Sequence, residues 1–420
     1  MNLLVALEHR FNRLPDGSVW TNTFFARSFF ERYLSVFSSV SVIARVAEVD
    51  SVPSTAKRAD GEGVTFVPIS YYVGAWEYLR KARQIRKDIA AAAQREGAVI
   101  LRASSQIGNS LEPHLRSMHR PYALEIVGDP YDVYSPGAIR HPLRPFFRWW
   151  FPRILRRQCA RASATAYVTS YALQKRYPPA SGTFTTHYSS VELPQNAFAA
   201  SPRSATARDR LLRILMVGTL EQFYKGPDVL IQAFAACLSK GLKAELHLLG
   251  GGRQMPILQE LTRKLGVADR VHFLGSVSGG EAVREQLDAA DLFVLPSRTE
   301  GLPRAMIEAM ARGLPCIGSA VGGIPELLDA DYLVPSEDPE SLANKILWLA
   351  NDPSQMQSAS ARNLERAHDY SEEILAKRRF AFYQYVRETT AASMSAGKCR
   401  ASHAEPVHSK CSEDSTRASQ

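Results

Sequence analysis

The chain is poor in the features that mark secreted and membrane-spanning proteins. Its 420 residues include five cysteines and no Cys-x-x-Cys pair, so we expect no disulfide framework. No apolar run reaches the roughly 18 residues that a membrane span needs. The first residues, MNLLVALEHRF, contain an early glutamate and lack the apolar core of a secretory signal. These absences predict a reducing, cytoplasmic location.

Metal-ligand patterns are also missing. The ten histidines show no spacing typical of a metal site. Asp329 and Asp331 form an Asp-x-Asp sequence, but the stretch around them has the composition of a polar loop. We therefore expect neither a metal ion nor another cofactor.

Acidic residues are scarce in the first half of the chain. Residues 1–205 hold 26 Lys or Arg and 15 Asp or Glu, a net charge of +11, whereas the remainder carries −2. This asymmetry predicts an anionic partner for the first half, either a membrane surface or a nucleic acid.

The basic character is strongest in residues 138–161, AIRHPLRPFFRWWFPRILRRQCAR. This segment holds seven arginines, five Phe or Trp residues and no acid, and its three prolines predict short pieces rather than one helix. Arginines beside aromatics favour peripheral contact with anionic lipid. The aromatics could instead pack into the core beneath arginine stems, and binding of nucleic acid is the least favoured alternative.

Short apolar runs alternate with helical patterns along most of the chain, which predicts two α/β domains with mostly parallel sheets. We place a first Rossmann-like domain at residues 1–200 and a second at 207–370. A long helix over 371–387 follows. The Ser- and Ala-rich residues 389–420 are expected to be disordered.

One stretch organises the second domain: LFVLPSRTEGLPRAMIEAMARGLPCIGSAVGGIP, residues 292–325. It predicts a buried strand, a compact loop, a helix beginning near Pro303 and a second strand. Backbone N–H groups at such a helix start are unpaired and suit an anion. Glu300 and Glu308 bracket the helix start, and ionised carboxylates accept hydrogen bonds from sugar or ribose hydroxyls.

The stretch from Glu300 to Glu308 resembles the Glu-x7-Glu motif of retaining, two-domain glycosyltransferases of family 4. The surrounding Gly-Leu-Pro-Cys-Ile and Gly-Gly-Ile-Pro-Glu sequences strengthen the resemblance. It implies a GT-B fold, with two facing Rossmann-like domains and an active site in the cleft between them. It is firm over residues 211–385 and looser over 1–200.

The resemblance also implies roles for single residues. Glu300 would contact hydroxyls of a donor sugar, and Glu308 would bind the ribose. Lys225 would hold the diphosphate and stabilise charge on the leaving group. The other positions implied to meet the nucleotide sugar are Gly218, Thr219, Ser276, Val277, Gly301, Leu302 and Pro303.

Two positions match the family less well. Thr219 stands where an arginine is usual, so one cation is missing. The glycine-rich loop expected after the first strand is represented by Gly17 alone. Asp129 follows a strand where relatives carry a histidine near the donor sugar, so it is a candidate catalytic residue, and a turn or capping aspartate is equally compatible.

We therefore expect a retaining hexosyltransferase that uses a nucleotide-diphosphate sugar and a lipid-linked or saccharide acceptor. Such an enzyme would serve cell-surface or exopolysaccharide synthesis, as a cytoplasmic protein peripheral to the inner face of the membrane. Two alternatives remain: a nucleotide-sugar epimerase of the same fold, and a non-catalytic subunit that binds a nucleotide sugar.

Overall fold

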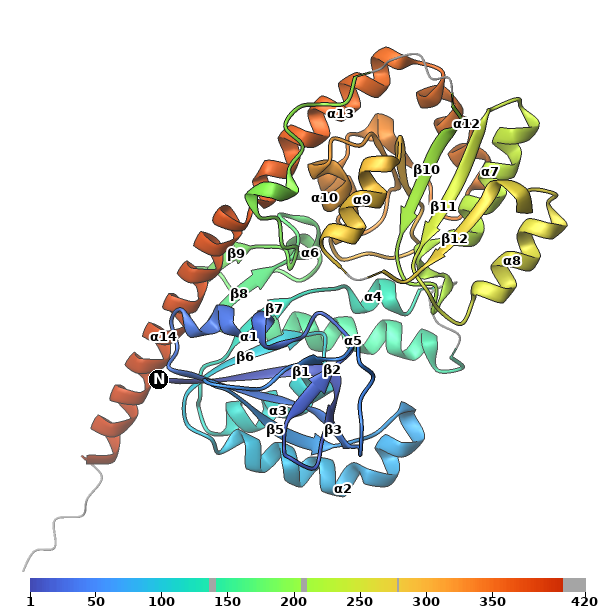
Figure 1. The fold of residues 1–420 in the computed structure, drawn as a ribbon. Coiled ribbons are helices and arrows are strands. Elements are labelled where there is room, and N and C mark those ends of the chain that lie inside the picture. The colour runs from blue at the N-terminus through green and yellow to red at the C-terminus, as the bar shows by residue number, and fades with distance from the viewer. Residues whose placement is uncertain (136–140, 205–209, 278, 403–420) are drawn as a thin grey trace, which may run out of the picture.

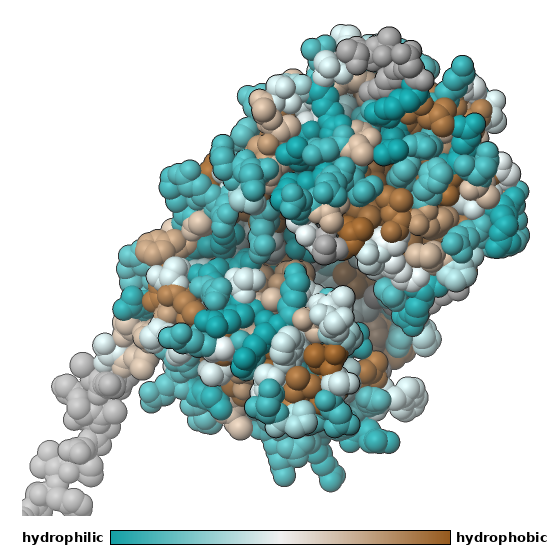
Figure 2. Space-filling view, viewed as in Figure 1, coloured by the Kyte–Doolittle hydropathy of each residue, from teal (hydrophilic) through white to brown (hydrophobic). Residues whose placement is uncertain are grey.

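The computed structural model describes residues 1–135, 141–204, 210–277 and 279–402. It contains two α/β lobes, each built on a mainly parallel sheet flanked by helices, and a long C-terminal helix runs along the side of the first lobe (Figure 1). The space-filling view shows a largely hydrophilic surface that is recessed where the lobes meet (Figure 2). In the described part of the chain, no helix combines the length and apolarity needed to cross a membrane.

The first domain is organised around β1, whose apolar residues from Leu3 to Leu7 are buried between helices. Seven parallel strands pair in the order β5-β3-β1-β6-β7-β8-β9, and two short antiparallel strands, β2 and β4, extend the sheet beside the end of β1. The strands are β1 (Asn2–Arg13), β2 (Val19–Thr21), β3 (Ser39–Glu48), β4 (Lys57–Arg58), β5 (Val64–Ser70), β6 (Ala98–Ala103), β7 (Ala123–Ile126), β8 (Ala164–Tyr167) and β9 (Phe184–His187). The helices are α1 (Arg27–Leu34), α2 (Gly74–Ala93), α3 (Gln106–Ser117), α4 (Pro130–Val133), α5 (Arg144–Cys159) and α6 (Ala172–Arg176).

The second domain is a six-stranded parallel sheet in the order β12-β11-β10-β13-β14-β15. Most residues of its central strands are apolar and buried, as expected for strands covered on both faces. The strands are β10 (Leu212–Val217), β11 (Ala244–Leu249), β12 (Val271–Gly275), β13 (Leu292–Leu295), β14 (Cys316–Ser319) and β15 (Leu333–Val334). The helices are α7 (Pro227–Ser239), α8 (Met255–Lys264), α9 (Glu281–Ala289), α10 (Arg304–Ala311), α11 (Ile324–Leu327), α12 (Pro339–Ala350) and α13 (Pro353–Ala367). The prediction of an α/β chain with two Rossmann-like units is confirmed.

Helix α14 (Glu372–Ser402) leaves the second domain and packs on the first. Phe382 and Tyr383 are buried there, and the Tyr385 ring stacks on Phe184 with 4.8 Å between centroids. The expectation of disorder from residue 389 is wrong over 389–402, because the helix continues through an Ala-rich sequence of good helix propensity. The rest of that expected tail, residues 403–420, lies outside the described residues.

The chain crosses between the domains twice, and the two connections touch. The backbone N–H of Glu372 donates to the Leu193 carbonyl oxygen at 3.1 Å. The Phe198 ring stacks on His368 with 4.4 Å between centroids. The two crossings therefore lie side by side.

Helix α5 corrects the expectation for the basic segment. Residues 144–159 form one continuous helix, although the sequence predicts short pieces. Pro145 lies in the first turn, where its missing N–H needs no partner, and Pro152 is buried within the helix, so packing offsets its lost hydrogen bond. Residues 138–140 of the segment lie outside the described part of the chain.

Candidate active site

The loop between β13 and α10 is the centre of the site. Ser297, Thr299 and Glu300 are all buried in it. Pro303 is the residue before α10, with extended backbone dihedrals, so the helix begins one position later than the sequence predicts. The loop is therefore a rigid element that fixes the position of the Glu300 carboxylate.

The structure brings three of the predicted residues together. The Lys225 ammonium donates to Glu300 Oε1 at 2.6 Å, and the Ser297 hydroxyl donates to the same oxygen at 2.7 Å. The Lys225 stem lies over Gly218, where an added Cβ would approach its Cγ to 3.3 Å. Gly218 thus leaves room for the lysine, and the charged pair is 14% and 7% exposed.

Arg298 holds the two loops of this site in place, and the sequence analysis did not single it out. Its guanidinium donates to both oxygens of Asp228, at 2.8 and 2.9 Å, and to the Phe223 carbonyl oxygen at 2.6 Å. The backbone also approaches closely here, since a Cβ at Gly226, where φ is +71°, would lie 2.1 Å from the Pro296 carbonyl oxygen. The sequence feature that could have indicated this role is the arginine inside the Pro-Ser-Arg-Thr-Glu-Gly loop.

A first cavity, of about 230 Å³, joins the two domains beside Glu300. Gly301 forms the contact, because a Cβ there would lie 2.7 Å from the Val127 carbonyl oxygen of the first domain. The lining residues are Gly128, Asp129, Val133, Gln222, Tyr224, Thr299, Glu300 and Gly301. The carboxylate of Glu300 therefore faces the first domain across a small, open cavity.

Asp129 lines this cavity, but its carboxylate is already used. It accepts from the Tyr131 backbone N–H at 2.8 Å as the N-cap of α4, and it is also bonded by the Tyr177 hydroxyl and the Arg176 guanidinium. The alternative of a capping aspartate is observed, and the catalytic role of Asp129 stays a prediction. All three interactions orient α4 at the cavity wall.

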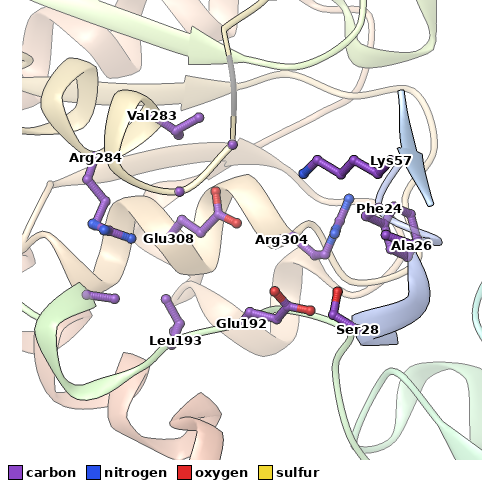
Figure 3. Close-up of a pocket in the computed structure, with 13 residues that line it drawn as sticks. Phe24, Ala26, Ser28, Lys57, Glu192, Leu193, Val283, Arg284, Arg304 and Glu308 are labelled. Carbon is purple, nitrogen blue, oxygen red and sulfur yellow. The ribbon is translucent and has the colours of Figure 1, made fainter. Parts of the chain in front are cut away.

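A second cavity, of about 330 Å³, contains Glu308 (Figure 3). Glu308 and Arg304 project into it from α10, Arg284 from α9, Lys57 from β4 and Glu192 from the segment after β9. Among the described residues, none lies within hydrogen-bonding distance of the Glu308 carboxylate. Burial raises the pKa of that carboxyl, while Arg304 and Arg284 oppose the shift.

Three cations therefore line the second cavity, and two of them, Arg284 and Arg304, belong to the second domain. Arg304 lies over the Phe24 ring at 4.2 Å. Lys57 and Glu192 come from the first domain, so they become neighbours of Glu308 only through the fold. Local sequence patterns gave no signal for them.

The remaining predicted positions lie in different surroundings. Leu302 is buried, and Ser276 and Val277 are exposed after β12 at the carboxyl edge of the sheet. The Thr219 hydroxyl accepts from the Glu221 N–H at 3.2 Å, so it closes a turn. Gly17 lies in the β1–β2 turn with φ of +85° and lines neither cavity, so its contact with substrate stays a prediction. It lies there because β1 continues past a bulge into a hairpin instead of ending at a loop.

One cluster of possible metal ligands lies elsewhere in the described residues, on β11 and β12. It consists of Glu245, His247 and His272. The Arg213 guanidinium donates to Glu245 Oε1 at 2.8 Å, so this carboxylate is already neutralised without a metal ion.

Glu326 ties the domains together. It is 2% exposed in α11 and accepts from the N–H groups of Ser170, Tyr171 and Ala172, at 2.5, 3.2 and 2.7 Å, and from the Ser170 hydroxyl at 2.8 Å. These donors begin α6 in the first domain. The Gly-Gly-Ile-Pro-Glu sequence contained this residue, but its partners could not be read from it.

We expect Glu326→Ala to lower the free energy of unfolding by about 2 kcal/mol, because it leaves three partly buried backbone donors without their acceptor. Scanning calorimetry should show the interdomain cooperativity reduced, with the first domain melting earlier. Glu365→Ala, at an exposed position on α13, is the control. An unchanged thermogram for Glu326→Ala would contradict this role.

Comparison with known proteins agrees with this geometry. The chain shares its fold with sucrose-phosphate synthase from Thermosynechococcus elongatus, at a TM-score of 0.63 and 18% identity over 96% of this chain and 100% of that one. It also matches Anabaena HepE in complex with UDP-glucose, at a TM-score of 0.60 and 17% identity, covering 94% of this chain and 100% of that one. Two facing Rossmann-like domains with the site between them define the GT-B class.

Residues 212–352 match the family model described as glycosyl transferases group 1. The match covers the second domain, where the motifs that resemble this family lie. Protein CapJ of Staphylococcus aureus is 26% identical over 325 residues, 77% of this chain and 80% of CapJ. N-acetyl-alpha-D-glucosaminyl L-malate synthase of Bacillus anthracis is 33% identical over 38% of this chain and 42% of the relative. The putative colanic acid biosynthesis glycosyltransferase WcaL of Escherichia coli is 33% identical over 42% of this chain and 45% of WcaL. In the last two relatives the match thus spans less than half of the protein.

Proposed function

We propose that the protein transfers a hexose from a nucleotide-diphosphate sugar to a lipid-linked or saccharide acceptor, with retention of configuration, in the synthesis of a cell-surface polysaccharide. The observation that carries the proposal is the buried Lys225–Glu300 pair, which lies over Gly218 and faces the first domain. The structural match to a protein bound to UDP-glucose supports the donor class, and the relatives CapJ and WcaL support the pathway class.

In this proposal the Lys225–Glu300 ion pair breaks when the donor binds, and each residue then contacts a different part of the donor. Lys225 turns to the diphosphate and stabilises the charge that develops on the leaving group. Glu300 then accepts hydrogen bonds from hydroxyls of the sugar, with the backbone of Gly301, Leu302 and Pro303 beside it. Because front-face transfer lets the leaving diphosphate take the acceptor proton, positioning and electrostatics suffice without a protein nucleophile or a metal ion.

Glu308 is assigned to the ribose. It has no hydrogen-bond partner among the described residues, and the carboxylate is aimed into the larger cavity (Figure 3). Arg284, Arg304 and Lys57 supply positive charge around that cavity. They offset the absence of an arginine at Thr219. The exposed positions Ser276 and Val277 would meet the base.

Peripheral contact with the inner face of an anionic membrane completes the proposal. The described part of the 138–161 segment exposes Leu143, Phe146, Trp149 and Trp150 on and beside α5. Exposed aromatics next to arginines are typical of interfacial helices. Membrane contact would bring the enzyme to a lipid-linked acceptor.

The first test is calorimetric binding of a panel of nucleoside diphosphates and nucleotide sugars. One selective ligand, weakened by both Lys225→Ala and Glu308→Gln, is the expected result. Nucleoside diphosphate should then be released only when an acceptor is supplied. Release without an acceptor would favour an epimerase-type or hydrolytic reaction, and absence of binding to every ligand would overturn the donor site.

For Glu308→Gln we expect about a tenfold loss of affinity, because a charge-assisted hydrogen bond to ribose is lost. Wild-type affinity should also fall as the pH drops through the raised pKa of Glu308, since protonation removes the carboxylate acceptor. The glutamine variant should lack this pH dependence. Glu365→Gln is the matched control, and equal pH profiles for Glu308→Gln and the wild type would contradict the assignment.

A further inference from the structure

Beside the exposed aromatics of α5 lies a third cavity, of about 420 Å³. Four arginines line it, Arg144, Arg148, Arg153 and Arg156, together with Tyr131, Tyr134, Trp149, Pro145 and Pro152. Its described lining contains no carboxylate. The cavity is therefore strongly basic and partly aromatic.

These arginines are held close to one another without acidic partners. Among the described residues, none of the four forms an ion pair. Arg148 stacks on the Tyr131 ring at 4.0 Å, and its Nε atom is buried without a hydrogen-bond partner. Arg153 stacks on Trp149 at 4.1 Å and donates to the Trp149 carbonyl oxygen at 2.9 Å. Like charges gathered in this way repel one another, and a phosphate with several acceptor oxygens relieves the repulsion.

Two acids at the neighbouring helix α4 already pair with another arginine. Asp132 and Asp129 on α4 are both bonded to Arg176, which covers the other face of the region at 4.7 Å from the Tyr131 ring. Asp132 also feels the charge of Arg148, so the four arginines of the cavity share one nearby carboxylate that already pairs with Arg176.

The cavity opens at the surface that carries the exposed aromatics. Phe146 and Trp149 are 51% and 48% exposed, and the Phe146 ring is stacked with Trp150 at 5.9 Å between centroids. An apolar ridge beside an arginine-lined pocket matches the two ends of a phospholipid, with acyl chains against the aromatics and the phosphate among the arginines.

The short helix α4 and its N-cap contribute residues to both this cavity and the Glu300 cavity. Tyr131 lines the arginine cavity, whereas Asp129 and Val133 line the other. A lipid held at the arginines would therefore lie next to the proposed reaction site.

We propose that the arginine cavity binds the phosphate group of an anionic membrane phospholipid and so fixes the orientation of the enzyme on the bilayer. This inference rests on the membrane contact proposed above. It goes further, because it attributes the affinity for anionic lipid to one defined pocket and not to the general positive charge of the first domain.

The experiment compares two charge-matched double variants of the full chain. Arg144→Gln/Arg153→Gln removes two arginines of the cavity. Arg157→Gln/Arg161→Gln removes two that do not line it, from the end of α5 and the residues after it. Co-sedimentation is measured with vesicles of phosphatidylcholine alone, and with vesicles that also contain phosphatidylglycerol.

The expected result is binding to the phosphatidylglycerol vesicles that falls about tenfold or more in the cavity variant and no more than about threefold in the control. Equal losses in both variants would overturn the pocket in favour of diffuse attraction. Failure of the wild type to bind anionic vesicles would overturn the membrane contact itself.

A third set of vesicles contains a polyprenyl diphosphate in place of phosphatidylglycerol. Binding that depends on the cavity arginines only with this lipid would overturn the phospholipid assignment and identify the pocket as an acceptor site. Calorimetry with nucleoside diphosphates is run on the same variants, so that failure of the donor site is distinguished from failure of this pocket.

Discussion

Replacing Lys225 with alanine should lower the rate of sugar transfer at saturating donor by about 100- to 1,000-fold. This is the effect of removing one preorganised group that stabilises charge in a transition state. The substitution also leaves the buried Glu300 carboxylate with only the Ser297 hydroxyl as a partner. We therefore expect kcat to fall more than affinity for the donor.

The measurement is acceptor-dependent release of nucleoside diphosphate, with kcat and KM determined separately. Lys240→Ala is the matched control, since Lys240 is an exposed lysine of the same domain whose partner is the Asn344 side chain. A Lys225→Ala variant with kcat within threefold of the wild type would remove the lysine from the mechanism.

The second large effect concerns stability. Glu125 is 2% exposed in the first domain, where Arg102 donates to it at 2.5 Å and the hydroxyls of Tyr33 and Tyr188 donate at 2.9 and 2.8 Å. Replacing it with alanine leaves the buried guanidinium of Arg102 uncompensated. We expect Glu125→Ala to lose about 3–5 kcal/mol of unfolding free energy.

Urea unfolding followed by circular dichroism measures this loss. The control is Glu373→Ala, which removes an exposed ion pair with Lys377 within α14. This helix also contacts the Glu125 network, but the control should leave the urea midpoint unchanged. Because the Tyr383 hydroxyl of α14 also reaches Glu125, at 3.4 Å, the Glu125 variant should release that helix from the first domain. A midpoint equal to that of the wild type would show that the network contributes little.

The parts of the site that the sequence predicts are those built within single strand–loop–helix units. Lys225 and Gly218 belong to the loop after β10, and Glu300 and Glu308 bracket the start of α10. In a parallel sheet, the carboxyl ends of β10 and β13 share one edge, so their loops meet. The fold class follows from the same alternation of apolar strands and helices.

The parts that could not be predicted depend on contacts between distant segments. The sequence left the role of Asp129 open, because Arg176 and Tyr177 reach it only after β8 pairs beside β7. Gly17 was the one glycine in the stretch expected to form a phosphate loop. In the structure β1 extends instead into a hairpin with β2, and Gly17 lies in its turn. Lys57 and Glu192 reach the Glu308 cavity from another domain, and no local pattern records that arrangement.

The two adjacent crossings between the domains restrict how the cleft can open. A single connection would act as a tether and allow the lobes to separate or twist freely. Two connections touch here, at Leu193 with Glu372 and at Phe198 with His368. Together they act as a hinge whose rotation axis runs along that contact. Rotation about this axis opens the side of the cleft where Glu300 and Glu308 lie. It keeps the two domains aligned at both cavities. The same geometry means that neither lobe can be isolated by a single cut, because a fragment that ends near residue 200 lacks the helix that completes its core.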